Sequence, residues 1–349
     1  MWEAVYFDHS LEKLTALAEV AGEIGVDVVE WQRLRAGDGR LGDYEAFLAR
    51  RPDWPGIPLL REKGEEAVAR STDPARVIAY FGADLPETAK GSIAYIRALQ
   101  STGRVADAEN EAFRAWTTLP FGPDEEQQIL GLYGDALSVA HEVRLDRLLW
   151  QNRTSEAKRM LPRVSSGWRA LAEARMALHA DADGVNAMIA RIPPALQSDP
   201  GLAFERFDWR FRRDRNDDAA ETVIAASKSR QTLGDPDAWG ERRASLSRAL
   251  LRDGKPKAAY RVAASNHLTE GSDYADLEFL SGWIALRFLG DPATALAHFK
   301  RLEAAVSTPI STARAQYWQG RALQAAGDAG GATAAYQQAA RHQTAYYGL

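Results

Sequence analysis

The sequence predicts an all-α protein, a curved solenoid in which helical hairpins stack on one another. Three observations support this prediction. Apolar residues recur at helical spacing while strand-type alternation is scarce, Asp-Pro pairs mark helix starts, and turn residues recur along the chain. The composition is that of a folded protein, because 46% apolar and 26% charged residues are average for globular chains.

Helix starts are marked by proline directly after Asp73, Asp199, Asp235 and Asp291. An Asp side chain accepts hydrogen bonds from the free N–H groups of the first helical turn. Proline at the first helical position has no N–H to lose. We therefore expect a helix to begin at each of these prolines.

Turn residues recur between the two helices of each expected hairpin. We expect them at Gly103, Asn152, Asp181, Arg215, Gly254, Gly290 and Gly327. Successive turns are 29 to 49 residues apart, and we interpret "TTLPFGPDEEQ" as an insertion within the longest interval.

The last hairpin has small and aromatic residues at tetratricopeptide-like positions, namely Gly320, Ala322, Gly327, Ala332, Tyr336 and Ala339. Each such hairpin leaves an apolar face that only its neighbours can bury, so stacking follows. The 10 Trp and 11 Tyr residues are spread through the chain, which favours wedges between helices over one aromatic site.

Composition argues against several classes of function. A net charge of −5 provides no field to recruit nucleic acid or an anionic membrane surface, and no stretch approaches 18 consecutive apolar residues. The chain has no cysteine, which excludes zinc fingers, disulfide frameworks and thiol nucleophiles. Its six histidines include no near pair spaced to share a metal on one helix, so we expect neither a metal nor a cofactor.

Three short motifs look like functional sites, and we interpret each as structural. "GDGRLG", from Gly37 to Gly42, matches a dinucleotide fingerprint but follows a helical pattern, so we expect a helix-ending turn. "HEVRLD" begins like a zinc-protease helix at His141, but Leu145 stands where the second histidine belongs. "WRFRRDR" could grip phosphates, yet we expect an amphipathic helix with Trp209 inside and arginines outside.

No nucleophile elbow and no phosphate-binding loop occurs in the sequence, so the residues by themselves describe a scaffold. The N-terminus "MWEAVYFDHSLEKL" carries Glu3 and Asp8 where a secretion signal needs a basic start and an apolar run. This leaves two interpretations, a cytosolic protein or a mature form with a new Met1.

The C-terminal stretch "ARAQYWQGRALQAAGD", followed by "AYQQAARHQTAYYGL", resembles the superhelical part of soluble lytic transglycosylases, which cleave peptidoglycan in the Gram-negative periplasm. Upstream, "DRLLWQNRTSEAKRML", "DPDAWGERRASLSRALLRDGKPKAAYRVAASNH" and "YADLEFLSGWIALRFLGDPATALAHF" are similar to hairpins of that family in order and spacing. The resemblance covers roughly residues 27–349 as an ordered set of repeats.

The resemblance implies a right-handed superhelix, ring- or horseshoe-shaped, over residues 1–308. It also implies that residues 309–349 form a last hairpin on which a C-terminal lysozyme-like catalytic domain docks. In the family that domain carries the catalytic Glu and forms 1,6-anhydro ends at the MurNAc-GlcNAc bond. Because the domain would begin just past Leu349, we expect residues 1–349 to be inactive alone, with no catalytic residue in this chain.

By the same resemblance we expect a periplasmic location, and we expect glycan strands, the catalytic domain and cell-wall machinery proteins as partners. Candidate residues for domain docking or glycan contact are Tyr317, Trp318, Arg321, Tyr346 and Tyr347. Two alternatives stay open. These residues could serve only to pack the solenoid, or the chain could be a stand-alone adaptor whose concave surface binds a protein or peptide. An adaptor should end in a polar capping helix, which "HQTAYYGL" does not resemble.

Overall fold

The computed structural model describes residues 22–348. The first 21 residues of the predicted 1–308 domain, and Leu349, lie outside the described part of the chain. Within residues 22–348 the regular elements are helices and no strand occurs, which confirms the all-α prediction. The chain divides into two compact units. Unit 1 ends at Arg147 and takes in Lys158–Arg163, whereas unit 2 comprises Leu148–Ala157 and the chain from Val164 onward.

Unit 1 is built from short helices, most of which pack against helices near them in the sequence. In chain order its elements are α3 (Glu23–Arg35), α4 (Leu41–Arg50), α5 (Ile57–Val68), α6 (Pro74–Phe81), α7 (Ala89–Ser101), α8 (Val105–Thr118), α9 (Pro123–Leu137), η1 (Ser138–Ala140), α10 (His141–Trp150), α11 (Thr154–Met160) and η2 (Leu161–Arg163). The last three of these reach or cross the boundary with unit 2.

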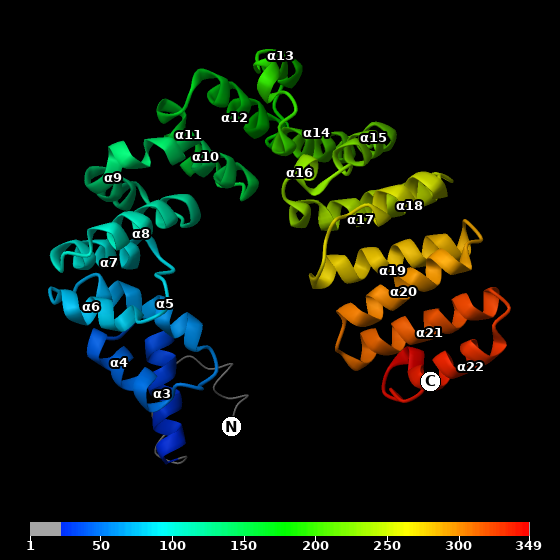
Figure 1. Cartoon of the computed structure of the whole chain (residues 1–349), viewed down its shortest axis with the longest axis horizontal. Coiled ribbons are helices and arrows are strands. Elements are labelled where there is room, and N and C mark those ends of the chain that lie inside the picture. Colours follow the sequence, from blue (N-terminus) through cyan, green and yellow to red (C-terminus); the bar gives the residue numbers. More distant parts are fainter. Residues whose placement is uncertain (1–21, 349) are drawn as a thin grey trace. The chain divides into compact units, whose positions relative to one another are not determined.

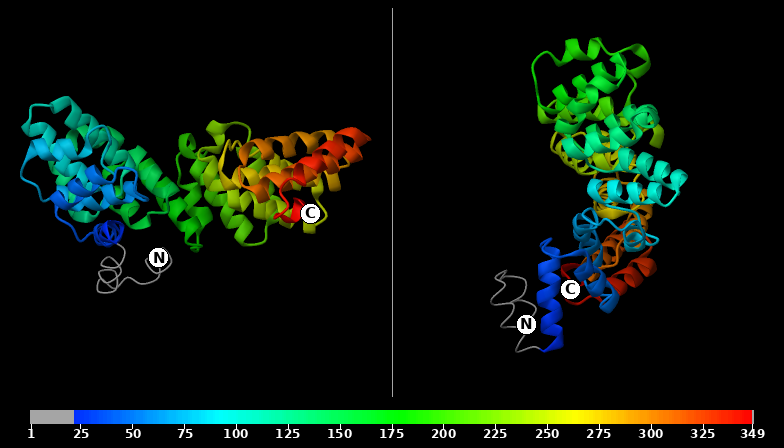
Figure 2. Two further views of the ribbon diagram at one scale, coloured as in Figure 1. Left: turned by 90° about the horizontal axis from the view of Figure 1, so that it is seen from below. Right: turned by 90° about the vertical axis from the view of Figure 1, so that its left-hand side faces the viewer.

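Unit 2 contains longer helices that pair into hairpins, and Figures 1 and 2 show the hairpins of α17 to α22 stacked in chain order. Its elements are α12 (Ser166–His179), α13 (Val185–Ala190), η3 (Pro194–Leu196), α14 (Pro200–Arg212), α15 (Asn216–Ala226), α16 (Arg230–Leu233), α17 (Pro236–Arg252), α18 (Pro256–Ala264), α19 (Gly271–Arg287), α20 (Pro292–Ala305), α21 (Pro309–Ala325), α22 (Ala329–Ala339) and η4 (Tyr346–Gly348).

Contacts between consecutive helices are those of a helical repeat solenoid, in which each hairpin buries its apolar face against the next. The predicted handedness and the ring or horseshoe shape stay predictions. The predicted boundary between residues 308 and 309 falls between α20 and α21, inside unit 2, and it too stays a prediction.

The four Asp-Pro helix starts are confirmed. Asp73, Asp199, Asp235 and Asp291 each precede a helix whose first residue is proline, and each side chain accepts a hydrogen bond from a first-turn N–H. The shortest is 2.7 Å, from the Leu202 N–H to Oδ1 of Asp199. The sequence therefore specified these four helix boundaries by local chemistry alone.

The predicted hairpin turns share one backbone geometry, a residue at positive φ just past the first helix. Six of the seven predicted positions have it: Gly103, Asn152, Asp181, Gly254, Gly290 and Gly327. In the seventh turn the residue at positive φ is Asp214, with φ 54°, and not Arg215. Asp reaches the left-handed region more readily than Arg, because its short side chain bonds locally.

Six of these seven turns close by a hydrogen bond from the backbone N–H of the residue after the left-handed position to a carbonyl five residues earlier, and at Gly290 the carbonyl lies six residues earlier. Lys255 donates to the Leu250 carbonyl at 2.8 Å, and Asp328 donates to the Leu323 carbonyl at 3.0 Å. The bond satisfies a carbonyl left free at the helix end. The repeated turn thus folds each hairpin back on itself.

The segment "TTLPFGPDEEQ", interpreted as an insertion, consists of the end of α8, a short link and the start of a further helix. Only Leu119–Gly122 links α8 to α9, and Pro123 opens α9. In this link Phe121 is buried against Trp116, with ring centroids 5.8 Å apart. The long interval between predicted turns therefore holds an extra helix.

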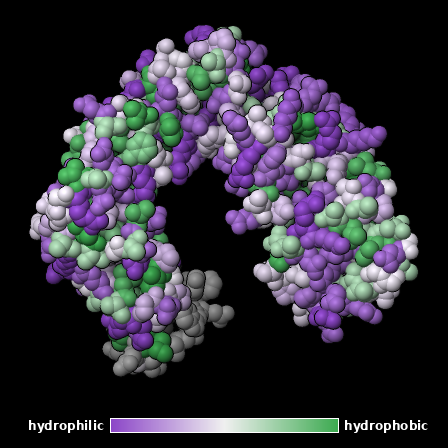
Figure 3. Space-filling view, in the orientation of Figure 1, coloured by the Kyte–Doolittle hydropathy of each residue, from purple (hydrophilic) through white to green (hydrophobic). Residues whose placement is uncertain are grey.

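Tryptophans serve mainly as packing wedges, as expected. Trp116 and Trp239 are fully buried. Trp239 lies 5.0 Å from Phe207, centroid to centroid, and its Nε1 donates to the Leu233 carbonyl at 3.1 Å. In the view of Figure 3, hydrophobic residues form small groups among hydrophilic ones over unit 2. The apolar area is thus largely internal, with local exceptions.

Buried arginines hold the C-terminal ends of neighbouring helices. Nη1 of Arg144 donates to the Trp116 carbonyl at 2.6 Å, at the end of α8. Nη1 of Arg243 donates to the Val262 carbonyl at 2.8 Å, at the end of α18. A helix C-terminus carries partial negative charge and free carbonyls, which suits it to accept hydrogen bonds from a buried guanidinium.

The three look-alike motifs are structural, as expected. Gly37 has φ 84° and ends α3. His141 is buried with its ring 5.6 Å from that of Trp116, and burial lowers the pKa of this imidazole. Trp209 is partly buried in a core cluster, while Arg213 stacks 4.4 Å above its ring and pairs with Asp181.

No helix within residues 22–348 has the length and hydropathy needed to cross a membrane. The same residues contain no group of three or more His, Cys, Asp or Glu side chains arranged to hold a metal ion.

Candidate functional site

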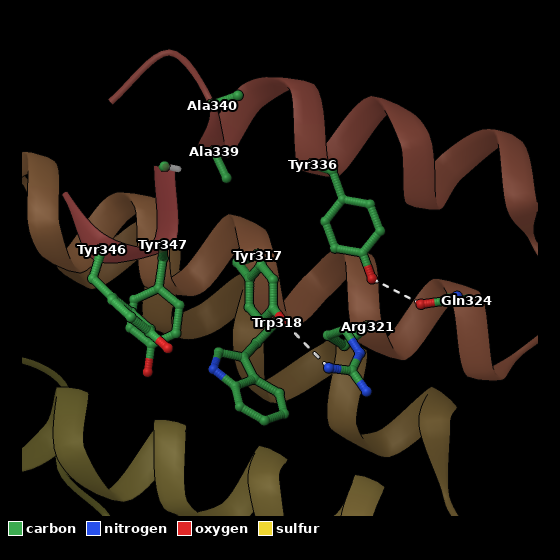
Figure 4. Close-up of a pocket in the computed structure, with 10 residues that line it drawn as sticks. Tyr317, Trp318, Arg321, Gln324, Tyr336, Ala339, Ala340, Tyr346 and Tyr347 are labelled. Carbon is green, nitrogen blue, oxygen red and sulfur yellow. Dashed lines mark hydrogen bonds between the residues drawn. The ribbon is translucent and has the colours of Figure 1, made fainter. Parts of the chain in front are cut away.

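The five residues singled out from the sequence line one pocket, although they come from two segments of the chain. The pocket has a volume of about 940 Å³ and lies between α21, α22 and η4 (Figure 4). Its lining consists of Tyr317, Trp318, Arg321, Gln324, Tyr336, Ala339, Ala340, Tyr346, Tyr347 and Gly348. We call this the aromatic pocket.

Helix α21 supplies one wall. Tyr317, Arg321 and Gln324 are four and seven positions apart, which places them on one face of the helix. Nη1 of Arg321 donates to the Tyr317 hydroxyl at 3.1 Å, and this bond raises the pKa of the guanidinium. The wall therefore presents a fixed cation beside an aromatic ring.

Helix α22 supplies Tyr336, whose approach depends on a glycine in α21. The Tyr336 hydroxyl donates to Oε1 of Gln324 at 2.9 Å (Figure 4). A Cβ on Gly320 would lie 2.5 Å from the Tyr336 ring, so only glycine allows this close packing. Burial raises the pKa of Tyr336, which therefore remains a neutral hydrogen-bond donor at pH 7.

The short 3-10 helix η4 supplies the remaining aromatic side chains. The Tyr347 ring lies 5.4 Å from that of Tyr317, centroid to centroid, while the Tyr346 ring stands 5.1 Å from that of Tyr347. Tyr346 is 82% exposed. Gly348 is buried, and a Cβ there would lie 2.1 Å from the His342 carbonyl oxygen, which explains the glycine of the Tyr-Tyr-Gly segment.

The floor of the pocket joins it to the core. The Trp318 ring packs against Phe299 and Phe279, with both centroid distances 5.9 Å. Its buried Nε1 makes no hydrogen bond to any residue in the described part of the chain. The Trp318 ring therefore fixes the floor of the pocket on the aromatic core.

This arrangement is suited to binding. Tyr, Trp and Arg are the residue types enriched in the energetic centres of protein interfaces, because they combine large apolar area with polar tips. A large exposed aromatic side chain such as Tyr346 also marks a surface that gains free energy when covered.

Sequence reasoning found five of the lining residues and missed the others. Gln324 could have been found, because it is seven residues from Tyr317 and so shares its helix face. The sequence identified Tyr336 as a position of the helical repeat but not as part of the pocket. Its place in the pocket depends on how α22 folds back over Gly320, which the spacing along the chain does not reveal.

Comparison with known proteins adds no assignment. The sequence matches no protein-family model, and no curated protein matches it.

Proposed function

We propose that this chain is the non-catalytic helical scaffold of a periplasmic lytic transglycosylase. In this proposal the aromatic pocket docks a lysozyme-like catalytic domain that cleaves the MurNAc-GlcNAc bond of peptidoglycan and leaves a 1,6-anhydro product. Residues 1–349 supply support and position, and the chemistry belongs to the docked domain.

One observation carries the proposal: the residues expected to dock a catalytic domain do converge on one partly exposed pocket beside the last hairpin. A partner surface that buries Tyr346 and fills the pocket gains apolar contact area, and Arg321, which the Tyr317 hydroxyl holds in place, can fix its orientation. The similarity of the upstream hairpins to the transglycosylase superhelix supports the same assignment.

Product analysis tests the proposal. The native gene product is incubated with peptidoglycan sacculi, and the released material is analysed by mass spectrometry for 1,6-anhydro ends. We expect anhydro products from the native gene product and none from residues 1–349 alone. Failure of the native gene product to release them would contradict the proposal, and so would release by residues 1–349.

A double substitution tests the docking role of the pocket. Tyr346→Ala with Tyr347→Ala in the native gene product should lower the rate of product release and the thermal stability of the catalytic domain. Tyr133→Ala is the control, because Tyr133 lies on α9 in unit 1 and accepts a hydrogen bond from Gln100. If the double variant abolishes binding of a separate protein while no anhydro product ever forms, the chain is an adaptor.

A further inference from the structure

A second pocket in unit 2 has a composition that the scaffold role does not explain. It has a volume of about 590 Å³ and is formed by α17, α19, the residue after α19 and α21. Its lining comprises Arg248, Leu251, Arg252, Asp276, Phe279, Leu280, Trp283, Phe288 and Arg314. The volume is within the range of small-molecule sites. We call it the arginine pocket.

Aromatic rings form the apolar part of the arginine pocket. Trp283 and Phe288 meet edge to face, with ring centroids 5.1 Å apart, and Phe288 is 46% exposed. Phe288 directly follows the last residue of α19, so its ring projects where the helix ends. The exposed parts of the two rings provide apolar surface against which a partly apolar ligand can pack.

Three arginines face one carboxylate in this pocket. Nη2 of Arg248 donates to both Asp276 oxygens, at 2.9 and 2.7 Å, so this pair is neutral overall. The guanidinium of Arg314 lies 4.5 Å from the centre of the Phe279 ring, and its buried Nε makes no hydrogen bond within residues 22–348. Arg252 is exposed and forms no ion pair with any described residue.

Arg252 and Arg314 leave two positive charges in the pocket without a carboxylate from the described residues, and these favour an anionic ligand. A guanidinium stacked on an aromatic ring keeps its N–H edge free, and that edge matches a carboxylate in a two-pronged geometry. The local charge is opposite to the net charge of −5 on the whole chain, so it is a property of this site. The pocket thus combines apolar platforms with a cationic edge.

We propose that the arginine pocket binds a carbohydrate that carries a carboxylate, with the sugar ring against Trp283 and Phe288 and the carboxylate on Arg252 and Arg314. The identification of the sugar as a muramyl unit of a glycan strand rests on the proposed function. A muramyl unit is an amino sugar with a lactyl carboxylate on the ring, and therefore presents both features to one site. The scaffold then holds substrate as well as the catalytic domain.

Two tetrasaccharides test this proposal, because they share the same sugar backbone and differ only in the lactyl group, with its carboxylate, that each muramyl ring carries. One is GlcNAc-MurNAc-GlcNAc-MurNAc without stem peptides, and the other is chitotetraose. Each is titrated calorimetrically into the 349-residue chain. We expect the muramyl tetrasaccharide to bind at least about tenfold more tightly, the effect of one charge-assisted hydrogen-bonded contact. Equal affinities, or binding of neither, would overturn the proposal.

Variants locate the site. Arg252→Gln combined with Arg314→Gln should remove the preference for the muramyl sugar, and Trp283→Leu should weaken both sugars. Arg252→Gln alone should reduce the preference at least about threefold without affecting folding, because its side chain is exposed. The matched control is Arg213→Gln, since Arg213 stacks on the Trp209 ring much as Arg314 stacks on Phe279 but pairs with Asp181.

A preference that survives in the double variant would place the sugar elsewhere and overturn the assignment, provided that circular dichroism shows the variant folded. If the double variant is unfolded, Arg252→Gln alone decides the outcome. If a tetraglutamate peptide competes with the muramyl tetrasaccharide at equal affinity, the pocket is a general site for acidic peptides, and this result would likewise overturn the assignment. Sugar binding to the arginine pocket is independent of product release, so either this proposal or the proposed function can fail alone.

Discussion

The rings of Phe279 and Trp318 lie 5.9 Å apart, edge to face, and each belongs to the wall of a different pocket. Phe279 lines the arginine pocket and carries the guanidinium of Arg314 on its face. Trp318 lines the aromatic pocket, and its ring contacts that of Tyr317, which in turn contacts the ring of Tyr347. The proposed glycan site and the proposed docking site therefore share a row of contacting aromatic side chains.

Phe279→Leu tests this shared wall. The substitution keeps an apolar side chain but removes the ring that contacts Trp318 and Arg314, so unfolding free energy should fall by about 1 kcal/mol. Affinity for the muramyl tetrasaccharide should fall several-fold in calorimetry. Phe113→Leu serves as the control, because Phe113 is 46% exposed on α8 and should be close to neutral in urea unfolding. No change in the Phe279 variant would show that the ring supports neither pocket.

Gly320→Ala tests the packing of Tyr336. The new methyl group would lie 2.5 to 2.9 Å from three atoms of the Tyr336 ring, which must move, and we expect a loss of about 2 kcal/mol from overpacking. Gly330→Ala is the contrasting change, because its Cβ meets only Oδ1 of Asp328 at 3.8 Å. That variant should gain about 0.5 kcal/mol from reduced entropy of the unfolded chain. Urea midpoints that shift equally in both variants would contradict this account of the pocket.

Arg243→Met tests the buried arginines. The guanidinium is fully buried and donates to the Val262 and Ser265 carbonyls and to the Ser227 hydroxyl, while burial lowers its pKa. Methionine of similar length leaves those acceptors unsatisfied, so we expect a loss of about 3 kcal/mol in chemical unfolding.

Arg248→Met is its matched control. Arg248 lies on the same helix but is exposed, so its pair with Asp276 contributes about 0.5 kcal/mol or less. Comparable losses in the two variants would refute a special role for the buried guanidinium.

Glu205 gives unit 2 a pH-dependent stability. Burial raises the pKa of this carboxyl to about 7 from its ordinary 4.5, against the attraction of Arg175, and Asp208 raises it further. Its Oε2 lies 3.5 Å from Nδ1 of His179. Because the folded state holds the proton more tightly, the contribution is complete below pH 4.5 and is lost as pH rises through 7.

Glu205→Gln removes this titration. Relative to that variant, the wild type should lose about 3 kcal/mol of unfolding free energy between pH 4.5 and pH 8, as the difference between the two pKa values requires. Urea unfolding across this range measures it, and the comparison with the variant cancels the contributions of groups distant from Glu205. A difference that stays constant, or grows in the opposite direction, would rule out the raised pKa.

Local chemistry made much of the fold predictable. Asp235 before Pro236 marks a helix start whatever surrounds it, and Gly254 marks the following turn because few other residues adopt its φ of 72°. The error at Arg215 is also local, since the left-handed residue is the preceding Asp214. The helix that begins at Pro123 within "TTLPFGPDEEQ" was not predicted, although proline is common at the first helical position.

The sequence predicted site residues only where they lie on one face of a single helix. Tyr317 and Arg321 share a face of α21, and the spacing in the sequence shows it. The arginine pocket was not predicted, because Arg252, Trp283 and Arg314 come from segments about 30 residues apart that only the stacking of hairpins brings together. Burial of Arg243 or Glu205 is likewise a tertiary property, since the sequence pattern does not distinguish these residues from exposed ones.

The central claim is that the aromatic pocket docks a lysozyme-like catalytic domain, and photo-crosslinking tests it most directly. In the native gene product Tyr346 is replaced by p-benzoylphenylalanine, a larger ring that a side chain 82% exposed can accommodate. After irradiation, digestion and mass spectrometry identify the crosslinked peptides. The account predicts crosslinks from position 346 to peptides of a lysozyme-like domain. Crosslinks confined to helices of the scaffold, or directed only to a separate protein, would contradict it.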